Sequence, residues 1–256
     1  MEILVQRKKL LALDLDDSLL KMFDKDGIML PRLLEDFFKK RLGKDDYSKV
    51  KEIIEEEKEP IVFDFRRYYN HRLGKREIIK REDLLEWFQE NNYLLLEFQP
   101  YEGIREALER IVDKHRIVII TNRVGWWGEK EIVEEYTRKW IKKNLGIEKK
   151  IKLILTEGKK PERLKELCMN AQLIIVDDSQ YSICDYIESE RKREIEIARL
   201  YIVQHNWNTK TKYDSNLPED LKKEKEEFLR AVYMGTTNGK ISYTTPDRLE
   251  EVLTSL

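Results

Sequence analysis

The sequence is poor in the residues that cross-link or interrupt a chain, and neither sign of charge dominates. Its 256 residues include 2 cysteines, 6 prolines, 10 glycines and 3 histidines. Cys168 and Cys184 lack the spacing of a metal motif, so we expect free thiols in a cytoplasmic protein. No uncharged apolar run reaches membrane-spanning length and no signal-peptide pattern is present, so no membrane association is expected.

The charge balance argues against partners that bind through bulk charge. Lysine and arginine number 49 and aspartate and glutamate 50, which leaves a formal charge of -1. We therefore expect no stable nucleic-acid binding driven by bulk positive charge. Charged residues make up 39% of the chain, a proportion that favours a surface rich in ion pairs, as in thermophilic proteins. The hydrophobic share of 41% is sufficient for a real core.

Short apolar runs predict the strands of a parallel sheet. From Pro100 onward these runs alternate with stretches whose apolar residues have helical spacing. This alternation predicts an α/β protein with a doubly wound, Rossmann-like parallel sheet. The predicted strands are 10–13, 116–121, 151–156, 173–178 and 198–203.

The segment 20–98 has helical stripes and no run typical of a parallel strand. We interpret it as a helical cap domain inserted between the first and second strands of a core domain, 1–19 and 99–256. A hairpin is predicted at Asp26-Gly27, inside this segment. Near the end of the chain, the pattern predicts a charged helix at 218–233, a hairpin at 237–240 and a closing helix at 246–253.

Polar residues gather where the predicted strands end. In a parallel sheet these ends share one edge, which is where open α/β sheets bind ligands. Crowded carboxylates are costly unless a cation holds them, and Mg²⁺ prefers such oxygen ligands together with a substrate phosphate. A hydroxyl and a lysine from other strand ends would hold the phosphate. The residues concerned are Asp14, Asp16, Asp17, Thr121, Asn122, the turn 156–160, Asp177 and Asp178.

Four motifs in this order resemble those of the haloacid-dehalogenase-like phosphohydrolases. They are Asp14-Leu15-Asp16-Asp17-Ser18, then Thr121, then Lys159 with Lys160 as the alternative, then Asp177-Asp178. The resemblance covers about residues 9 to 205.

The resemblance implies a role for each matched residue. Asp14 would attack phosphorus and form an aspartyl phosphate, while Asp16 would act as general acid and then base. Mg²⁺ would be bound by the Asp14 side chain, the Asp16 backbone carbonyl and the acid pair, with Asp178 as the direct ligand. Asp177 would orient a metal-bound water or Lys159. The phosphoryl oxygens would be held by Thr121, the Asn122 backbone and Lys159, and Asp17 would be a bystander.

A narrower resemblance covers about residues 100 to 206 and concerns the 5'(3')-deoxyribonucleotidase branch. It is carried by 134–146, by the strand and its end at 151–159 and by His205-Asn206, whereas Thr121-Asn122-Arg123 replaces that branch's Thr-Ser-Pro. The resemblance implies a 5'-nucleotidase that acts on a small-molecule phosphomonoester, a nucleotide.

Aromatic and basic side chains are candidates for holding the rest of the substrate. The candidate residues are Phe63, Phe65, Tyr68 and Arg123. Alternatively, the aromatic residues form the core of the cap itself, and Arg123 lies on the solvated surface. Trp126 and Trp127 either line the cleft or pack inside the protein.

Other functions stay open at this point. The enzyme could be a phosphatase for another small phosphorylated metabolite or for a nucleic-acid end. A protein of a different class, a phospho-receiver signalling module, uses similar residues at parallel-strand ends but in a different order along the chain.

Overall fold

A six-stranded sheet, in which every neighbouring pair is parallel, forms the centre of the computed structural model. The structure describes residues 9–23, 29–57, 60, 64–75, 77–168, 171–236 and 239–256. In spatial order the strands are β5 (Ile151–Leu155), β4 (Arg116–Thr121), β1 (Lys9–Leu13), β6 (Gln172–Asp177), β7 (Ile197–Val203) and β8 (Ile241–Thr244).

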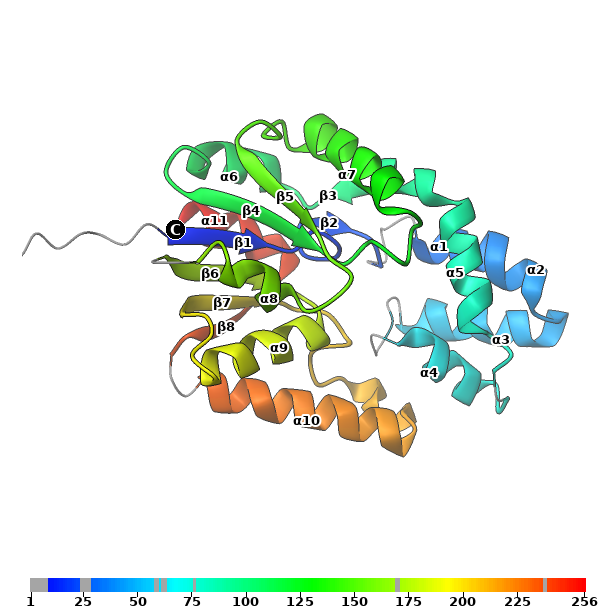
Figure 1. Ribbon diagram of the computed structural model, residues 1–256. Helices are drawn as coiled ribbons and strands as arrows, with labels where there is room; N and C mark the ends of the chain where they lie inside the picture. Colours follow the sequence, from blue (N-terminus) through cyan, green and yellow to red (C-terminus); the bar gives the residue numbers. More distant parts are fainter. Residues whose placement is uncertain are drawn as a thin grey trace, which may run out of the picture.

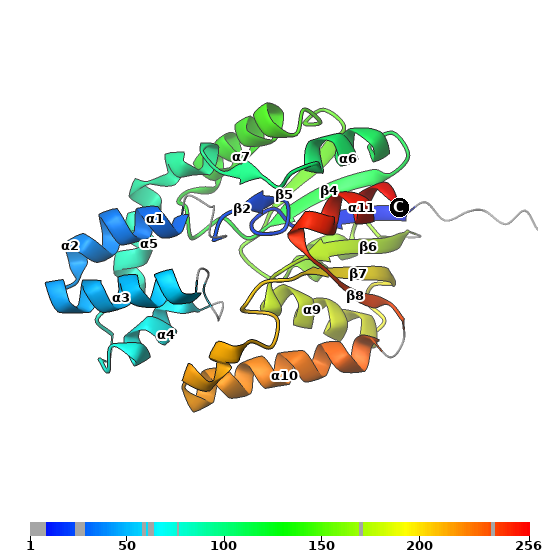
Figure 2. The same cartoon turned by 180° about the vertical axis from the view of Figure 1, so that it is seen from behind.

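Helices cover both faces of the sheet, which explains why its central strands β4, β1 and β6 are apolar along most of their length (Figures 1 and 2). Leu11 and Leu13 pack on one face, with α6 (Ile104–Ile111), α7 (Lys130–Asn144) and α11 (Leu249–Thr254). Leu10 and Ala12 face the opposite way, against α8 (Lys160–Lys165), α9 (Gln180–Arg191) and α10 (Glu219–Thr236). The predicted α/β fold class is therefore confirmed.

All five predicted strands are present, but the hairpin predicted at 237–240 is wrong. Tyr233, on its N-terminal side, lies within α10, and β8 after it pairs in parallel with β7. Helix α10 is thus a crossover between β7 and β8. The Asn238-Gly239 pair suggested a tight turn between two strands, although one of the two flanking segments is helical. The hairpin predicted at Asp26-Gly27 lies outside the described residues.

Apart from the two-residue strand β2 (Leu20–Lys21) at its start, the elements in the described residues of 20–98 are helices, as predicted. These helices lie beyond the carboxyl ends of the strands (Figure 1). They are α1 (Met29–Arg32), the π-helix η1 (Leu33–Phe38), α2 (Lys39–Arg41), α3 (Lys44–Glu57), α4 (Phe65–Arg72), α5 (Arg81–Glu90) and the 3-10 helix η2 (Asn92–Leu96). The segment leaves and rejoins the sheet through an antiparallel pair, β2 with β3 (Gln99–Pro100). Its separation as a cap domain stays a prediction.

The sequence predicts free thiols and no membrane-spanning segment. Cys168 and Cys184 are both free, and burial raises the pKa of each thiol, to about 11 for Cys168. Both thiols are therefore protonated and weakly nucleophilic at neutral pH. Among the described residues, no helix combines the length and apolar character needed to cross a membrane.

Candidate active site

Three neighbouring strands bring polar side chains together at one edge of the sheet. β1 lies between β4 and β6, and these strands end at Leu13, Thr121 and Asp177. Asp14 and Asp178 follow β1 and β6 directly. Because the carboxyl ends of parallel strands share an edge, residues more than 160 positions apart in the sequence meet there.

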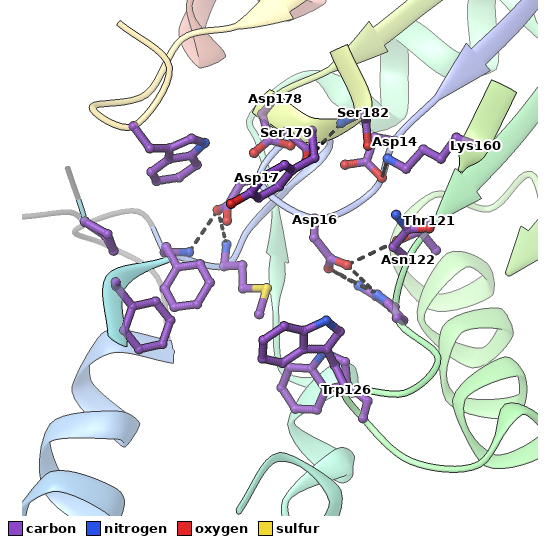
Figure 3. Close-up of a pocket in the computed structure, with 18 of the residues that line it drawn as sticks. Asp14, Asp16, Asp17, Thr121, Asn122, Trp126, Lys160, Asp178, Ser179 and Ser182 are labelled. Atoms are coloured by element: carbon purple, nitrogen blue, oxygen red, sulfur yellow. Dashed lines mark hydrogen bonds and ion pairs between the residues drawn. The ribbon is translucent and has the colours of Figure 1, made fainter. Parts of the chain in front are cut away.

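Lys160 joins two of the predicted acids. Its Nζ lies 2.7 Å from Asp14 Oδ1 (Figure 3) and 2.8 Å from Asp177 Oδ2, and the residue is 2% exposed. Burial lowers the pKa of Lys160, but the attraction of the two carboxylates outweighs it and leaves that pKa well above the usual value. Asp177 is also fixed by the Ser179 backbone N–H, which donates to Oδ1 at 2.9 Å. Asp177 thus orients a lysine, as the motif comparison implied, but the lysine is Lys160.

Lys159, the lysine preferred from the motif spacing, is not at the site. Its side chain is 54% exposed, and its Nζ lies 2.9 Å from Asp185 Oδ1 and 3.7 Å from Glu188 Oε2 on α9. Lys159 is the N-cap of α8 and Lys160 is its first helical residue, so the two side chains leave the backbone in different directions. The expectation of Lys159 is therefore corrected to its alternative, Lys160.

The donor set at this edge suits a divalent cation. Asp14, Asp177 and Asp178 are buried, and each offers a carboxylate oxygen within 4.8 Å of the others. Burial raises the pKa of Asp14 to about 7, with Lys160 opposing the rise and Asp177 adding to it. Burial also holds the pKa of Asp178 well above its usual range, and Asp14 adds to the rise. When all three acids are ionised, three carboxylates face one ammonium and leave an excess of negative charge, and hard oxygen ligands of this kind fit Mg²⁺.

Asp178 is held at both its carboxylate and its carbonyl group. Ser18 Oγ donates to Asp178 Oδ1 at 3.0 Å, so the last residue of the first motif supports the acid of the fourth. Asn208 Nδ2 donates to the carbonyl oxygens of Asp178 and Val203 at 2.9 and 2.7 Å. Ser18 and Asn208 are both fully buried. These contacts restrict where the Asp178 carboxylate can point.

Asp16 is bound by an arginine that sequence reasoning placed elsewhere. Arg123 Nε lies 3.1 and 2.9 Å from the two Asp16 oxygens, and Nη2 lies 2.6 Å from Oδ1. Thr121 Oγ1, expected at the phosphate, donates to Asp16 Oδ2 at 3.2 Å. Arg123 is 1% exposed, which contradicts the solvated alternative. Asn122 is exposed and lines the pocket.

Asp17, predicted to be a bystander, stabilises the loop that leads to the helical segment. Its φ of 52° lies in the left-handed region, which aspartate tolerates better than most residues. The carboxylate accepts the backbone N–H groups of Met22 and Phe23 at 2.8 and 2.9 Å. His205 Nε2 lies 2.8 Å from the Asp17 carbonyl oxygen. Burial raises the pKa of Asp17 to about 7, and the nearby His205 limits the rise.

The acids lie at one end of a pocket of about 340 Å³ whose other walls are aromatic (Figure 3). Phe23 and Phe65 form one group, with ring centroids 5.5 Å apart. Phe88 forms a second group with Trp126 and Trp127, at 5.8 and 4.8 Å. The other apolar residues that line the pocket are Met22, Pro60, Tyr181 and Trp207.

Of the aromatic residues predicted to contact the substrate, only one of those that the structure describes is found in the pocket wall. Phe65 lines the pocket, whereas Tyr68 is fully buried and its hydroxyl donates to Glu57 Oε1 at 2.5 Å. Phe63 lies outside the described residues. Phe23 and Phe88 were missed, because each lies in a helical or loop pattern that is equally typical of a core residue.

The fold and the pocket define an α/β protein with an acidic pocket at the carboxyl edge of a parallel sheet. No protein-family model matches the sequence, and no curated protein sequence matches it. Among solved structures, a haloacid dehalogenase-like family hydrolase from Xanthomonas campestris is similar, with 13% sequence identity and a TM-score of 0.42. The match covers 98% of this chain and 96% of that chain. With so distant a match, the fold class rests on the sheet topology of the chain itself.

Proposed function

We propose that this protein is a Mg²⁺-dependent phosphomonoesterase of the haloacid-dehalogenase-like type, and that it acts as a 5'-nucleotidase through an aspartyl-phosphate intermediate. The observation that carries the proposal is the placement of Asp14. Its buried carboxylate follows the central strand, contacts Lys160 at 2.7 Å and lies beside two further acids. A nucleophilic carboxylate for phosphoryl transfer needs cations beside it, because the attacked group is itself an anion; Lys160 is one such cation, and an ion held by the acids would be a second.

Two of the three acids of the first motif, Asp14 and Asp16, would divide the chemistry between them. In the first step, an Asp14 oxygen bonds to phosphorus, the bond to the leaving oxygen breaks, and Asp16 gives that oxygen a proton. In the second step, Asp16 takes a proton from water, the water oxygen bonds to phosphorus, and the bond to Asp14 breaks. Phosphate is released and both acids return to their starting states.

Mg²⁺ is the cofactor that the donor set suits. The side chains of Asp14 and Asp178 would hold it together with the Asp16 backbone carbonyl, while Asp177 is engaged by Lys160 at 2.8 Å. When bound, the ion would offset the excess negative charge and polarise the phosphoryl group. Lys160 would contribute by fixing Asp14 and by attracting the phosphoryl oxygens.

The walls of the pocket favour a flat, largely apolar group on the substrate. Aromatic rings approach from the helical segment, at Phe65 and Phe88, and from the loop after β4, at Trp126. Both cations among the described lining residues, Arg123 and Lys160, already bind carboxylates. A substrate with one phosphoryl group and an aromatic ring therefore suits the pocket better than a diphosphate or a phosphorylated sugar acid. A nucleoside monophosphate meets this description.

The test is phosphate release by the purified protein with Mg²⁺ from nucleoside 5'-monophosphates, nucleoside diphosphates, sugar phosphates and p-nitrophenyl phosphate. We expect the monophosphates to be preferred, with activity lost on chelation and in Asp14→Asn. The control is Asp113→Asn, which changes an exposed acid paired with Lys150. Acid-quenched mass spectrometry should show one phosphoryl group bound to wild type and none to Asp14→Asn. Equal activity in Asp14→Asn, or no activity on any phosphate, would refute the proposal.

A further inference from the structure

Arg123 is a buried cation in the wall of the pocket. It follows β4 by two residues, and its backbone carbonyl accepts the N–H groups of Trp126 and Trp127 at 3.2 and 3.1 Å. This tight turn directs the guanidinium inward, where it is 1% exposed. A buried charge costs several kcal/mol unless its donors are satisfied, so the partners of Arg123 indicate what it is for.

The guanidinium connects Asp16 to helix α7. Nε and Nη2 face the Asp16 carboxylate at 2.6 to 3.1 Å, and Nη1 donates to Thr137 Oγ1 at 3.1 Å. Thr137 is fully buried on a face of α7 whose other buried members are apolar: Val133, Trp140 and Ile141. A hydroxyl at that position is explained by the arginine that it anchors.

The Asp16 end of this contact belongs to the pocket rather than to the core. The Asp16 side chain keeps 22% exposure and lines the cavity, while Thr121 Oγ1 supplies a further donor at 3.2 Å. An Asp16 carboxylate bound by a planar fork and a hydroxyl is restricted to one orientation. Asp14 has a separate cation, Lys160, so each acid of the first motif is held independently.

From this geometry we propose that Arg123 is a positioning residue for proton transfer: anchored by Thr137, it orients Asp16 so that the protonated carboxyl group gives its proton to the leaving oxygen and the resulting carboxylate takes one from water. The inference rests on the proposed phosphomonoesterase function and deepens it. Direct binding of a substrate anion by Arg123 is disfavoured, because its Nε, Nη1 and Nη2 already donate to protein oxygens. Misplacing a reacting group by about 1 Å can cost on the order of 10²-fold in rate.

The experiment compares two leaving groups. An alkoxide such as a nucleoside 5'-oxygen needs a proton as it departs, whereas p-nitrophenolate departs without one. Arg123→Met should lower kcat for a nucleoside 5'-monophosphate by about 10²-fold, with KM little changed. On p-nitrophenyl phosphate it should keep a rapid first turnover, seen as a burst of p-nitrophenolate, followed by slow turnover because the second step still needs Asp16. Asp16→Asn should behave in the same way.

Two further variants guard against a folding defect. Arg123→Lys keeps the charge without the planar fork and should restore kcat only in part. Thr137→Val removes the anchor alone and should give a smaller loss with the same dependence on the leaving group. Arg105→Met, which removes an exposed arginine paired with Glu109, is the matched control and should match wild type.

The outcomes separate this inference from the proposed function. If wild type hydrolyses both substrates and the first-turnover rates of Arg123→Met, Arg123→Lys and Thr137→Val fall by the same factor on both, the positioning role is refuted and the phosphatase stands. A rise in KM with kcat unchanged would instead show that Arg123 binds the substrate, and would also overturn the inference. If wild type hydrolyses neither substrate, the proposed function and this inference fall together.

Discussion

Replacing Lys160 by methionine should destabilise the metal-free protein by about 3–5 kcal/mol, because it leaves buried carboxylates without their counter-charge. The lysine is 2% exposed and contacts Asp14 and Asp177 at 2.7 and 2.8 Å. Methionine keeps most of the volume, so the loss reports charge rather than a cavity. A domain of this size loses roughly 2–4 °C of Tm per kcal/mol, so a fall of about 10 °C is expected.

The assay is urea denaturation followed by circular dichroism, with and without Mg²⁺, at pH 6 and pH 8. The deficit of Lys160→Met should be larger at pH 8, where the unpaired acids are driven to ionise, and smaller with Mg²⁺ present. Lys159→Met is the matched control and should denature like wild type, since its ion pairs with Asp185 and Glu188 are exposed.

A double variant separates charge from packing. In Lys160→Met with Asp177→Asn, one of the two stranded carboxylates is gone, so much of the lost stability should return. The reasoning would be refuted if Lys160→Met were as stable as Lys159→Met, or if its deficit were the same at both pH values and with Mg²⁺.

Three further outcomes are expected. The folded-state pKa of Asp14 is about 7, against 3.8 as its ordinary value, so the metal-free protein should lose stability as pH rises from about 4 through 7. Mg²⁺ should therefore raise Tm more at pH 8 than at pH 5. An equal rise in Tm at both pH values would contradict this. Asp17→Ala should cost about 2–3 kcal/mol in urea denaturation, through two lost charge-assisted hydrogen bonds and a strained left-handed backbone, whereas Asp17→Asn should cost less. Trp127→Ala removes a buried side chain and should lower the free energy of unfolding by about 3–5 kcal/mol. Trp126 is 39% exposed, so Trp126→Ala should leave stability unchanged and raise KM for aromatic phosphates. A loss of stability in Trp126→Ala with KM unchanged would exclude Trp126 as a substrate contact.

Where sequence reasoning failed, the missing information was the direction of a side chain. Lys159 and Lys160 are adjacent and chemically identical, and the phase of α8 alone sends one to Asp14 and the other to solvent. Arg123 is an ordinary basic residue in a loop until the fold brings it to Asp16, 107 positions earlier. Composition and spacing carry no information about such a contact.

The pocket walls show the same limit. Phe65 and Tyr68 were equivalent candidates in an aromatic-rich helix, yet one faces the pocket and the other is buried beside Glu57. Phe88 joins Trp126 and Trp127 only because the helical segment and the loop after β4 approach each other. A specificity surface made from separate segments has no local sequence pattern.

By itself, the sequence determined five of the six strands of the sheet, their alternation with helices and the presence of acids at the carboxyl ends of several of them. Those features follow from local rules, since fully buried strands must be apolar and crowded carboxylates must find a cation. Only the tertiary structure decided which cation meets which acid, that Asp16 is held by Arg123 and Thr121, and which aromatic rings line the pocket. Such pairings depend on helix phase and on long-range packing, in which small differences in backbone direction decide which side chains meet.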